Sequence, residues 1–184
     1  MSRRRIARIP QRKPIFLGGE GQSEEGYGAL LNRLAKEVDT VHIHILAESL
    51  QPGAGDPQAL VLRAVQRITD LERRRDTFAA KALFLDRGTA QKNEAAEALA
   101  KRNGIDLIWQ EPDFEAFLLH HLPGCQKLRP PPGESMPALL RHWPGYQKGM
   151  PALQLAKRIT LTEIRLAATV EPGLHELLKK LGLS

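Results

Sequence analysis

The stretch Pro14-Ile-Phe-Leu-Gly-Gly19-Glu20 is a short apolar run that ends in two glycines and a glutamate. A second run of this kind, Lys81-Ala-Leu-Phe-Leu85, ends in Asp86. Acids at the carboxyl ends of parallel strands lie where α/β sheets bind their ligands. If the two strands are neighbours, they lie about 5 Å apart. Glu20 and Asp86 can then bind one hard cation such as Mg²⁺.

The pattern around these two runs predicts strands that alternate with helices. The expected strands cover 15–17, 41–46, 81–85 and 105–109. The expected helices start at Ser23, at Asp56-Pro57, at Ala90 and at Asp113, and the last two extend to Arg102 and Leu122. Alternation of this kind predicts an α/β fold with three α/β/α layers and a small, mainly parallel sheet of about four strands.

The remaining segments divide the chain into four parts. Residues 1–13 form a basic arm that we expect to be flexible, and residues 14–122 form the α/β core. Residues 123–151 are rich in proline and glycine, which predicts an irregular loop with short helices at most, pinned to the body by Trp143 and Tyr146. Helices over 152–169 and 173–181 are expected to pack on the core.

Charge and cysteine content restrict the partners and the compartment. The net charge is +6 at pH 7, with many basic residues near the start, including Arg12 and Lys13. A basic surface beside an acidic metal site suits nucleic acid, although a basic tail that only aids solubility is an alternative. Cys125 is the only cysteine, and no apolar run reaches membrane-spanning length. We therefore expect a cytoplasmic protein that binds no membrane.

Four segments, in order along the chain, resemble the motifs of one family. They are Glu20-Gly-Gln-Ser-Glu24 followed by Tyr27, Phe84-Leu-Asp86-Arg87, Glu111-Pro-Asp-Phe-Glu115 with the following residues to Leu122, and Gly145-Tyr146-Gln-Lys148-Gly149. Together they are similar to the motifs of RloB-like proteins of the Toprim superfamily. The similarity covers roughly residues 14 to 168.

The resemblance implies a Mg²⁺- or Mn²⁺-dependent nuclease associated with bacterial anti-phage defence or restriction. The metal ligands would be Glu20 and Asp86, and Glu115 and Lys148 would complete the catalytic set. Defence nucleases of this kind often work beside a partner ATPase.

Several other residues are expected to contact nucleic acid or to support the site. Arg87, with Arg12 and Lys13, is expected to contact nucleic acid. Glu24 and His121 would support the site. Glu111 is a weaker candidate for a ligand.

One position departs from the family pattern. Toprim proteins carry two acids after the third strand, whereas this chain has Asp86-Arg87-Gly88. The departure leaves open an alternative in which a catalytically degenerate domain binds nucleic acid or protein without cutting. A phospho-receiver domain is a third reading, which Lys148 disfavours because it lies in an irregular loop.

The histidines are interpreted mainly as structural residues. His121 shares a helical stripe with Phe114 and Phe117, which indicates a packed, hydrogen-bonded core residue, whereas His120 is expected to be exposed. His42 and His44 alternate along a strand and so share one face. They suit the polar face of an edge strand better than a zinc pair.

Overall fold

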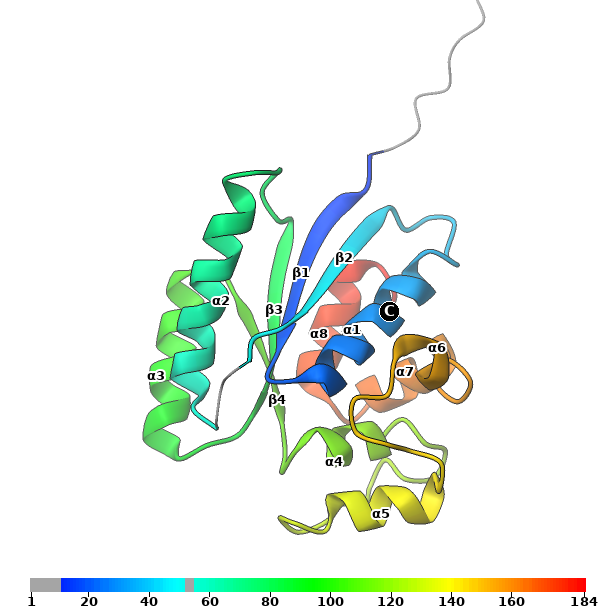
Figure 1. Ribbon diagram of the computed structural model, residues 1–184. Coiled ribbons are helices and arrows are strands. Elements are labelled where there is room, and N and C mark those ends of the chain that lie inside the picture. The colour runs from blue at the N-terminus through cyan, green and yellow to red at the C-terminus, as the bar shows by residue number, and fades with distance from the viewer. Residues whose placement is uncertain (1–10, 52–54) are drawn as a thin grey trace, which may run out of the picture.

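Four parallel strands form the centre of the protein. The computed structural model describes residues 11–51 and 55–184. The strands lie in the order β2-β1-β3-β4 (Figure 1). Their bounds are β1 (Lys13–Gly19), β2 (Ile43–Ser49), β3 (Ala80–Asp86) and β4 (Asp106–Gln110). The predicted four-stranded parallel sheet is therefore confirmed.

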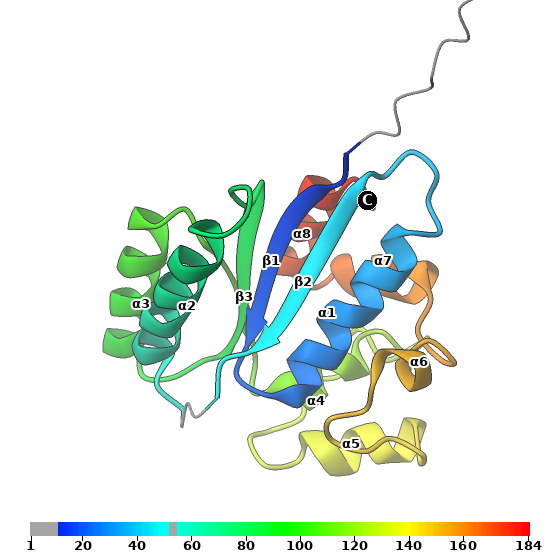
Figure 2. The ribbon, with the colours of Figure 1, turned by 45° about the horizontal axis from the view of Figure 1, so that its top comes forward.

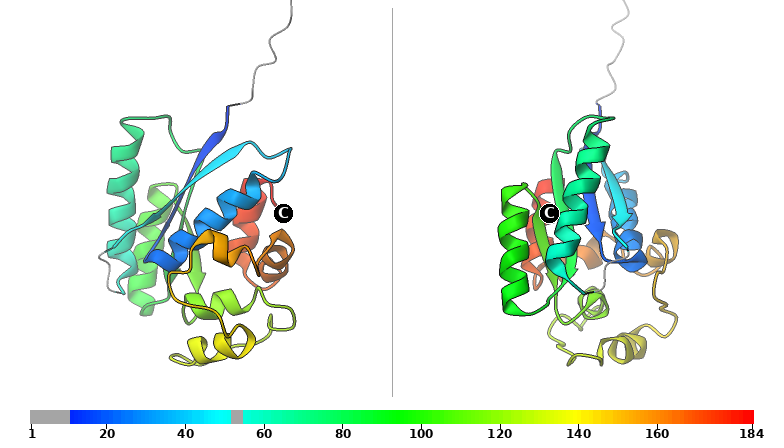
Figure 3. Two further views of the ribbon diagram at one scale, coloured as in Figure 1. Left: turned by 45° about the vertical axis from the view of Figure 1, so that its right-hand side comes forward. Right: turned by 60° about the vertical axis from the view of Figure 1, so that its left-hand side comes forward.

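Helices cover both faces of this sheet and form the outer two layers. One face packs against α2 (Pro57–Glu72) and α3 (Ala90–Arg102). On the side of the opposite face lie α1 (Gln22–Ala35) and the C-terminal helices (Figures 2 and 3). These are α4 (Phe114–Leu119), α5 (Ser135–His142), α6 (Ala152–Leu155), α7 (Leu161–Ala168) and α8 (Pro172–Leu181). Of these, α5 packs against α4 and α6 packs against α1. The expected three-layer α/β/α arrangement is confirmed.

The strand order reverses between β1 and β3. From β1 the chain continues to β2 on one side, and from β3 it continues to β4 on the other side. Such a reversal opens a crevice at the carboxyl ends of the two central strands, where α/β proteins bind ligands. Glu20 follows the last residue of β1, and Asp86 is the last residue of β3. The topology therefore brings both acids to the crevice.

Hydrogen bonds at the starts of α2 and α1 fix where these two helices begin beside the crevice. The Asp56 carboxylate accepts hydrogen bonds from the backbone N–H groups of Gln58 and Ala59, so Asp56 caps α2 as expected. The prediction that Ser23 caps the first helix was wrong, because the N-cap is Gly21, two residues earlier, and α1 begins at Gln22. There the Glu24 carboxylate accepts a bond of 3.1 Å from the Gly21 N–H.

The C-terminal part of the chain is folded against the core. Trp143 and Tyr146 are buried, as expected for residues that pin the proline-rich segment. The single helix expected over 152–169 is divided into α6 and α7, because Thr160 starts a new helix by accepting the Thr162 N–H. The longest helix, α2, has 16 residues, and no helix in the described ranges has the length and apolar character needed to cross a bilayer.

Gly19 is required because α1 begins very close to the end of β1. A Cβ atom at this position would lie 2.1 Å from the Glu24 Cβ atom. We predict that Gly19→Ala lowers the free energy of unfolding by about 1–3 kcal/mol, because backbone must move to relieve the overlap. Urea denaturation measures this change.

Gly145→Ala is the matched control. A Cβ atom at Gly145 meets no atom within 4 Å, and its φ is not in the left-handed region. The control should unfold at the wild-type urea concentration. A Gly19→Ala midpoint equal to that of wild type would show that α1 does not depend on this close approach.

Candidate active site

Acidic side chains line a pocket of about 480 Å³ at the carboxyl ends of β1 and β3. Five carboxylates contribute to its wall, namely Glu20, Glu24, Asp86, Asp113 and Glu115. We call these five residues the acidic site. They come from the ends of two strands and the beginnings of two helices. Lys148 brings a cation to the same wall.

Asp86 has the most unusual environment of the five. Its Oδ1 atom is buried and has no hydrogen-bond partner in the described part of the chain. Its pKa is raised from 3.8 to about 7, first by burial and then by the carboxylates of Glu24, Glu20, Asp113 and Glu115. A buried carboxylate oxygen without a donor is costly. A bound cation or a proton would satisfy it.

Glu24 has both a structural role and a place in the acidic site. Burial raises the pKa of its carboxyl, and the nearby charges of Glu20 and Glu115 raise it as well. The hydrogen bond from the Gly21 N–H acts in the opposite direction and stabilises the charged form. The same bond fixes the first turn of α1.

A hydrogen bond joins Glu20, which follows β1, to Gly55, which precedes α2. Its Oε1 atom accepts a hydrogen bond of 2.9 Å from the Gly55 N–H. Gly55 adopts a positive φ of 53°, a conformation that favours glycine. The sequence Gln51-Pro-Gly-Ala-Gly55 predicts an ordinary loop, and its residues 52–54 lie outside the described residues.

Glu115 is joined to the segment that contains Tyr146 and Lys148. The Tyr146 hydroxyl donates to Glu115 Oε1 over 3.4 Å, and Lys148 Nζ lies 3.6 Å from Oε2. Burial, followed by the Glu115 charge, raises the pKa of Tyr146, so its hydroxyl remains protonated and can donate. Ser23 Oγ accepts the Gly149 N–H at 3.0 Å and holds this segment on α1. The Tyr-x-Lys element and Glu115 therefore meet, as the motifs suggested.

Asp113 was missing from the predicted site. Its Oδ1 atom accepts the Ala116 N–H at 3.0 Å, so it caps α4 while its side chain also lines the pocket. Asp113 could have been found from sequence, because it lies at a helix start within the segment that resembles a family motif. It was missed because a role as helix cap is a sufficient reason for an aspartate at such a position.

Gln110 was also missed. It is fully buried, and neither of its side-chain polar atoms has a hydrogen-bond partner among the described residues. Gln110 is the register partner of Asp86 in the β3–β4 pairing. In a parallel pair, such partners place their side chains on the same face of the sheet. The register therefore places the Gln110 and Asp86 side chains on the same face at neighbouring positions of β4 and β3.

Arg87 and Glu111 belong to a different pocket. They form an ion pair of 3.2 Å and line a second hollow next to β4. Successive residues of a strand point to opposite faces, and Arg87 follows Asp86 at the strand end. Neither residue lines the acidic pocket.

Arg12 and Lys13 lie at the opposite end of the sheet. Lys13 begins the seven-residue strand that Glu20 follows. A strand of this length separates them by roughly 20 Å. The structure therefore does not bring these two expected nucleic-acid contacts to the acidic site.

The two adjacent histidines differ from each other. His121 is a core residue as predicted, with Nδ1–H donating to the Phe117 carbonyl and Nε2 accepting from the Tyr27 hydroxyl at 2.8 Å. Burial lowers its pKa to about 4, so it is neutral. The expectation that His120 is exposed was wrong. It is 1% exposed because the chain folds over it after α4, and its Nδ1 lies 2.5 Å from Glu171.

The acidic site fits a hard cation by its chemistry more than by its geometry. All five acids offer oxygen ligands, and the unpartnered Asp86 Oδ1 is one of them. However, within residues 11–51 and 55–184 no group of three or more His, Cys, Asp or Glu lies close enough together to hold one ion. Mg²⁺ is often bound by one or two carboxylates together with water and substrate phosphate. The carboxylates of the acidic site are of the chemical type that this mode uses, and Asp86 and Glu20 are the residues that would hold the ion.

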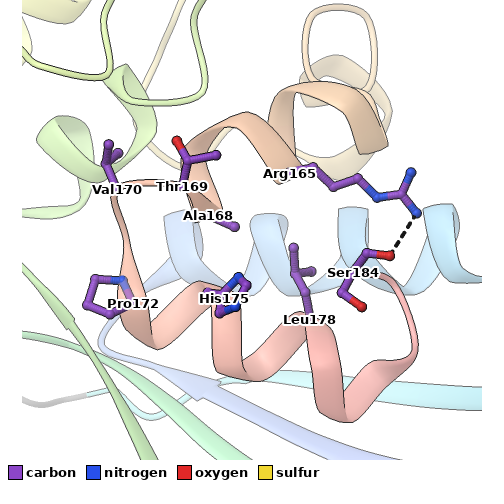
Figure 4. A pocket seen from close by; sticks show the side chains of 8 residues that line it. All are labelled: Arg165, Ala168, Thr169, Val170, Pro172, His175, Leu178 and Ser184. Carbon is purple, nitrogen blue, oxygen red and sulfur yellow. Dashed lines mark hydrogen bonds between the residues drawn. The ribbon is translucent and has the colours of Figure 1, made fainter.

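A third hollow, of about 490 Å³, lies between α7 and α8 (Figure 4). Arg165 donates to the carbonyl oxygens of Leu183 and Ser184 at its rim. No carboxylate side chain of the described residues lines it, and most of its wall is apolar. Its side chains offer no catalytic arrangement comparable to the acidic site.

Comparisons with protein-family models, with curated proteins and with solved structures found no match for this chain. The resemblance to RloB-like proteins therefore rests on the four motifs alone. Any function has to be argued from the geometry of the acidic site.

The raised pKa of Asp86 predicts how stability depends on pH. The folded state holds this proton more tightly than the unfolded chain, so the stability from Asp86 is complete below pH 3.8 and is lost as the pH rises through about 7. We expect Asp86→Asn to be more stable than wild type by about 2 kcal/mol near pH 8, a value that allows for residual solvent contact. The advantage should shrink steadily toward about pH 4.

Chemical denaturation at a series of pH values tests this expectation. Asp39→Asn, at an exposed position after α1, is the control and should follow the wild-type curve. An Asp86→Asn curve parallel to wild type at all pH values would show that Asp86 is not destabilised by its surroundings.

Proposed function

We propose that this chain is a metal-dependent nuclease that hydrolyses phosphodiester bonds in nucleic acid. The observation that carries the proposal is the meeting of five carboxylates at the strand reversal, with one oxygen of Asp86 buried and unpartnered. Crowded acids with perturbed pKa values in a crevice are typical of functional sites. Soluble domains have little structural reason to place like charges together in this way.

Residues of the acidic site would have different roles in the reaction. Asp86 and Glu20 would hold the cation, which when bound neutralises phosphate charge and lowers the pKa of a bound water. Lys148 is mostly exposed and lies at the pocket wall, where it can contact a phosphate oxygen as negative charge develops. Tyr146 orients Glu115, which can then accept a proton from water.

The resemblance to RloB-like Toprim proteins supports the same class of reaction. It adds a setting in bacterial anti-phage defence or restriction and, as a further part of the proposal, a partner ATPase. The placement of Glu115 beside Tyr146 and Lys148 supports this reading, because it brings together the last two motifs.

A second candidate function is a degenerate domain that binds nucleic acid or a partner protein without cutting. It is favoured by Gly88 in place of a second acid and by the lack of a three-acid metal group among the described residues. In this reading the acids of the pocket would be remnants of a catalytic ancestor. Binding would then be sensitive to salt and independent of metal.

The test combines Mn²⁺ titration by calorimetry with cleavage of labelled single-stranded and duplex nucleic acids. We predict that wild type binds Mn²⁺ and that a chelator stops cleavage. Glu20→Gln and Asp86→Asn should each reduce cleavage by at least about 100-fold, because each removes a cation ligand. Circular dichroism should show both variants folded.

Glu25→Gln is the matched control, because Glu25 is an exposed acid next to Glu24 that does not line the pocket. It should cleave at the wild-type rate. Nucleic-acid binding without Mn²⁺ uptake, and with no cleavage by wild type, would reject the nuclease and favour the binding domain.

A further inference from the structure

A second pocket, of about 600 Å³, lies directly beside the acidic site at the ends of β3 and β4. We call it the Trp109 pocket. Its wall includes Arg87, Trp109, Pro112, His120, Arg129 and Glu171. Its size is typical of a small-molecule site. Its residues differ from those of the acidic pocket, because it combines an aromatic ring and two arginines with several prolines.

Trp109 presents a fixed ring to this pocket. The ring is half-buried, and its Nε1–H donates to Glu97 of α3 at 3.1 Å. The Arg87 guanidinium lies over the ring, 5.4 Å from its centroid. Arg87 is otherwise held by Glu111, and the two side chains are 44% and 75% exposed. An exposed ion pair of this kind is weak, so the guanidinium can shift at low cost to admit a flat base between itself and the Trp109 ring.

Arg129, which also lines this pocket, is held in place by hydrogen bonds. Its Nη1 atom lies 2.7 Å from the Gln126 carbonyl oxygen and 2.7 Å from His120 Nε2. His120 is in turn buried against Glu171. The hydrogen bonds that Arg129 forms with the described residues all come from Nη1. Its remaining N–H groups can therefore contact a phosphate.

Residues that are adjacent in sequence line the two pockets. Asp86 lines one pocket and Arg87 the other, and the same holds for Asp113 and Pro112. A polymer that places a phosphate at the acidic site therefore has its next unit beside the Trp109 pocket. In nucleic acid this unit is a nucleotide, which offers a flat base and a charged phosphate.

We propose that the Trp109 pocket binds one unpaired nucleotide of a single-stranded nucleic acid whose neighbouring phosphodiester lies in the acidic site. The base stacks on Trp109 and the Arg87 guanidinium, and its phosphate contacts Arg129. A base inside a duplex is already stacked and paired and cannot enter such a pocket without being extruded. The inference rests on the proposed function only for the choice of substrate, and it selects single strands over duplexes.

Tryptophan fluorescence tests the proposal. The chain has two tryptophans, and Trp143→Phe leaves Trp109 as the only one. In this background, with EDTA present so that no metal-dependent cleavage occurs, a short oligothymidylate should quench the emission. Arg87→Gln and Arg129→Gln should each weaken binding by at least about 5-fold, as expected for the loss of one stacking or phosphate contact.

Arg73→Gln is the matched control. Arg73 is an exposed arginine paired with Asp70 at 3.3 Å, as Arg87 is paired with Glu111, but it lies at the end of α2 away from both pockets. It should bind the oligonucleotide as wild type does. The Arg87 side chain forms no hydrogen bond to backbone, so Arg87→Gln should fold normally. This variant still tests the proposal if Arg129→Gln fails to fold.

Three outcomes would overturn the proposal. They are equal binding of oligothymidylate by all three arginine variants, quenching by a blunt duplex as strong as by the single strand, and thymidine monophosphate binding as tight as that of the oligonucleotide. Cleavage that persists while the Trp109 pocket variants bind normally would reject this inference and leave the nuclease intact. Quenching without any cleavage would reject the nuclease and leave the pocket assignment standing.

Discussion

The partial burial of Asp86 among four other carboxylates is the constraint on which this site depends. Four of the five acids are stabilised by nearby donors, through the backbone N–H groups of Gly21, Gly55 and Ala116 and the hydroxyl of Tyr146. These bonds hold the charged groups close to one another without neutralising them. Asp86 Oδ1 has no such donor among the described residues, and burial, followed by the charges of the four neighbouring acids, raises the Asp86 pKa. Burial and neighbouring negative charges disfavour the charged form of Asp86, which a proton or a nearby positive charge would relieve.

The sheet topology and one close contact produce that crowding together. The reversal of strand order opens the crevice, and the absence of a side chain at Gly19 lets α1 start directly against β1. This places Glu24 over the strand end instead of in solvent. The same helix start holds the later Tyr146 segment through Ser23. Parts of the site that are more than a hundred residues apart in sequence therefore depend on the first turn of one helix.

The sequence predicts the sheet and its acidic edge, but not the directions of the side chains there. Apolar runs identify the ends of β1 and β3, so Glu20 and Asp86 are found from sequence. The pocket that a residue faces beyond a strand end depends on alternation and loop geometry, so the sequence does not reveal that Asp86 and Arg87 line different pockets. His120 shows the same limit, because only the fold of the chain after α4 reveals its burial. Asp113 was hidden by the common role of aspartate as a helix cap.

The structure around Gly88 bears on the absence of a second acid after β3. The Gly88 N–H donates to Asn93 Oδ1 at 2.9 Å, and Asn93 Nδ2 donates back to the Gly88 carbonyl at 3.2 Å. A Cβ atom at this position would contact Pro57 and Asn93, in the α2–α3 layer, and Gly88 does not line the acidic pocket. The side chain of an aspartate at position 88 would therefore leave the backbone toward the α2–α3 layer and not toward the acidic pocket. In this chain Asp113 brings the additional carboxylate to the pocket from the start of α4, so the departure from the motif does not by itself make the site degenerate.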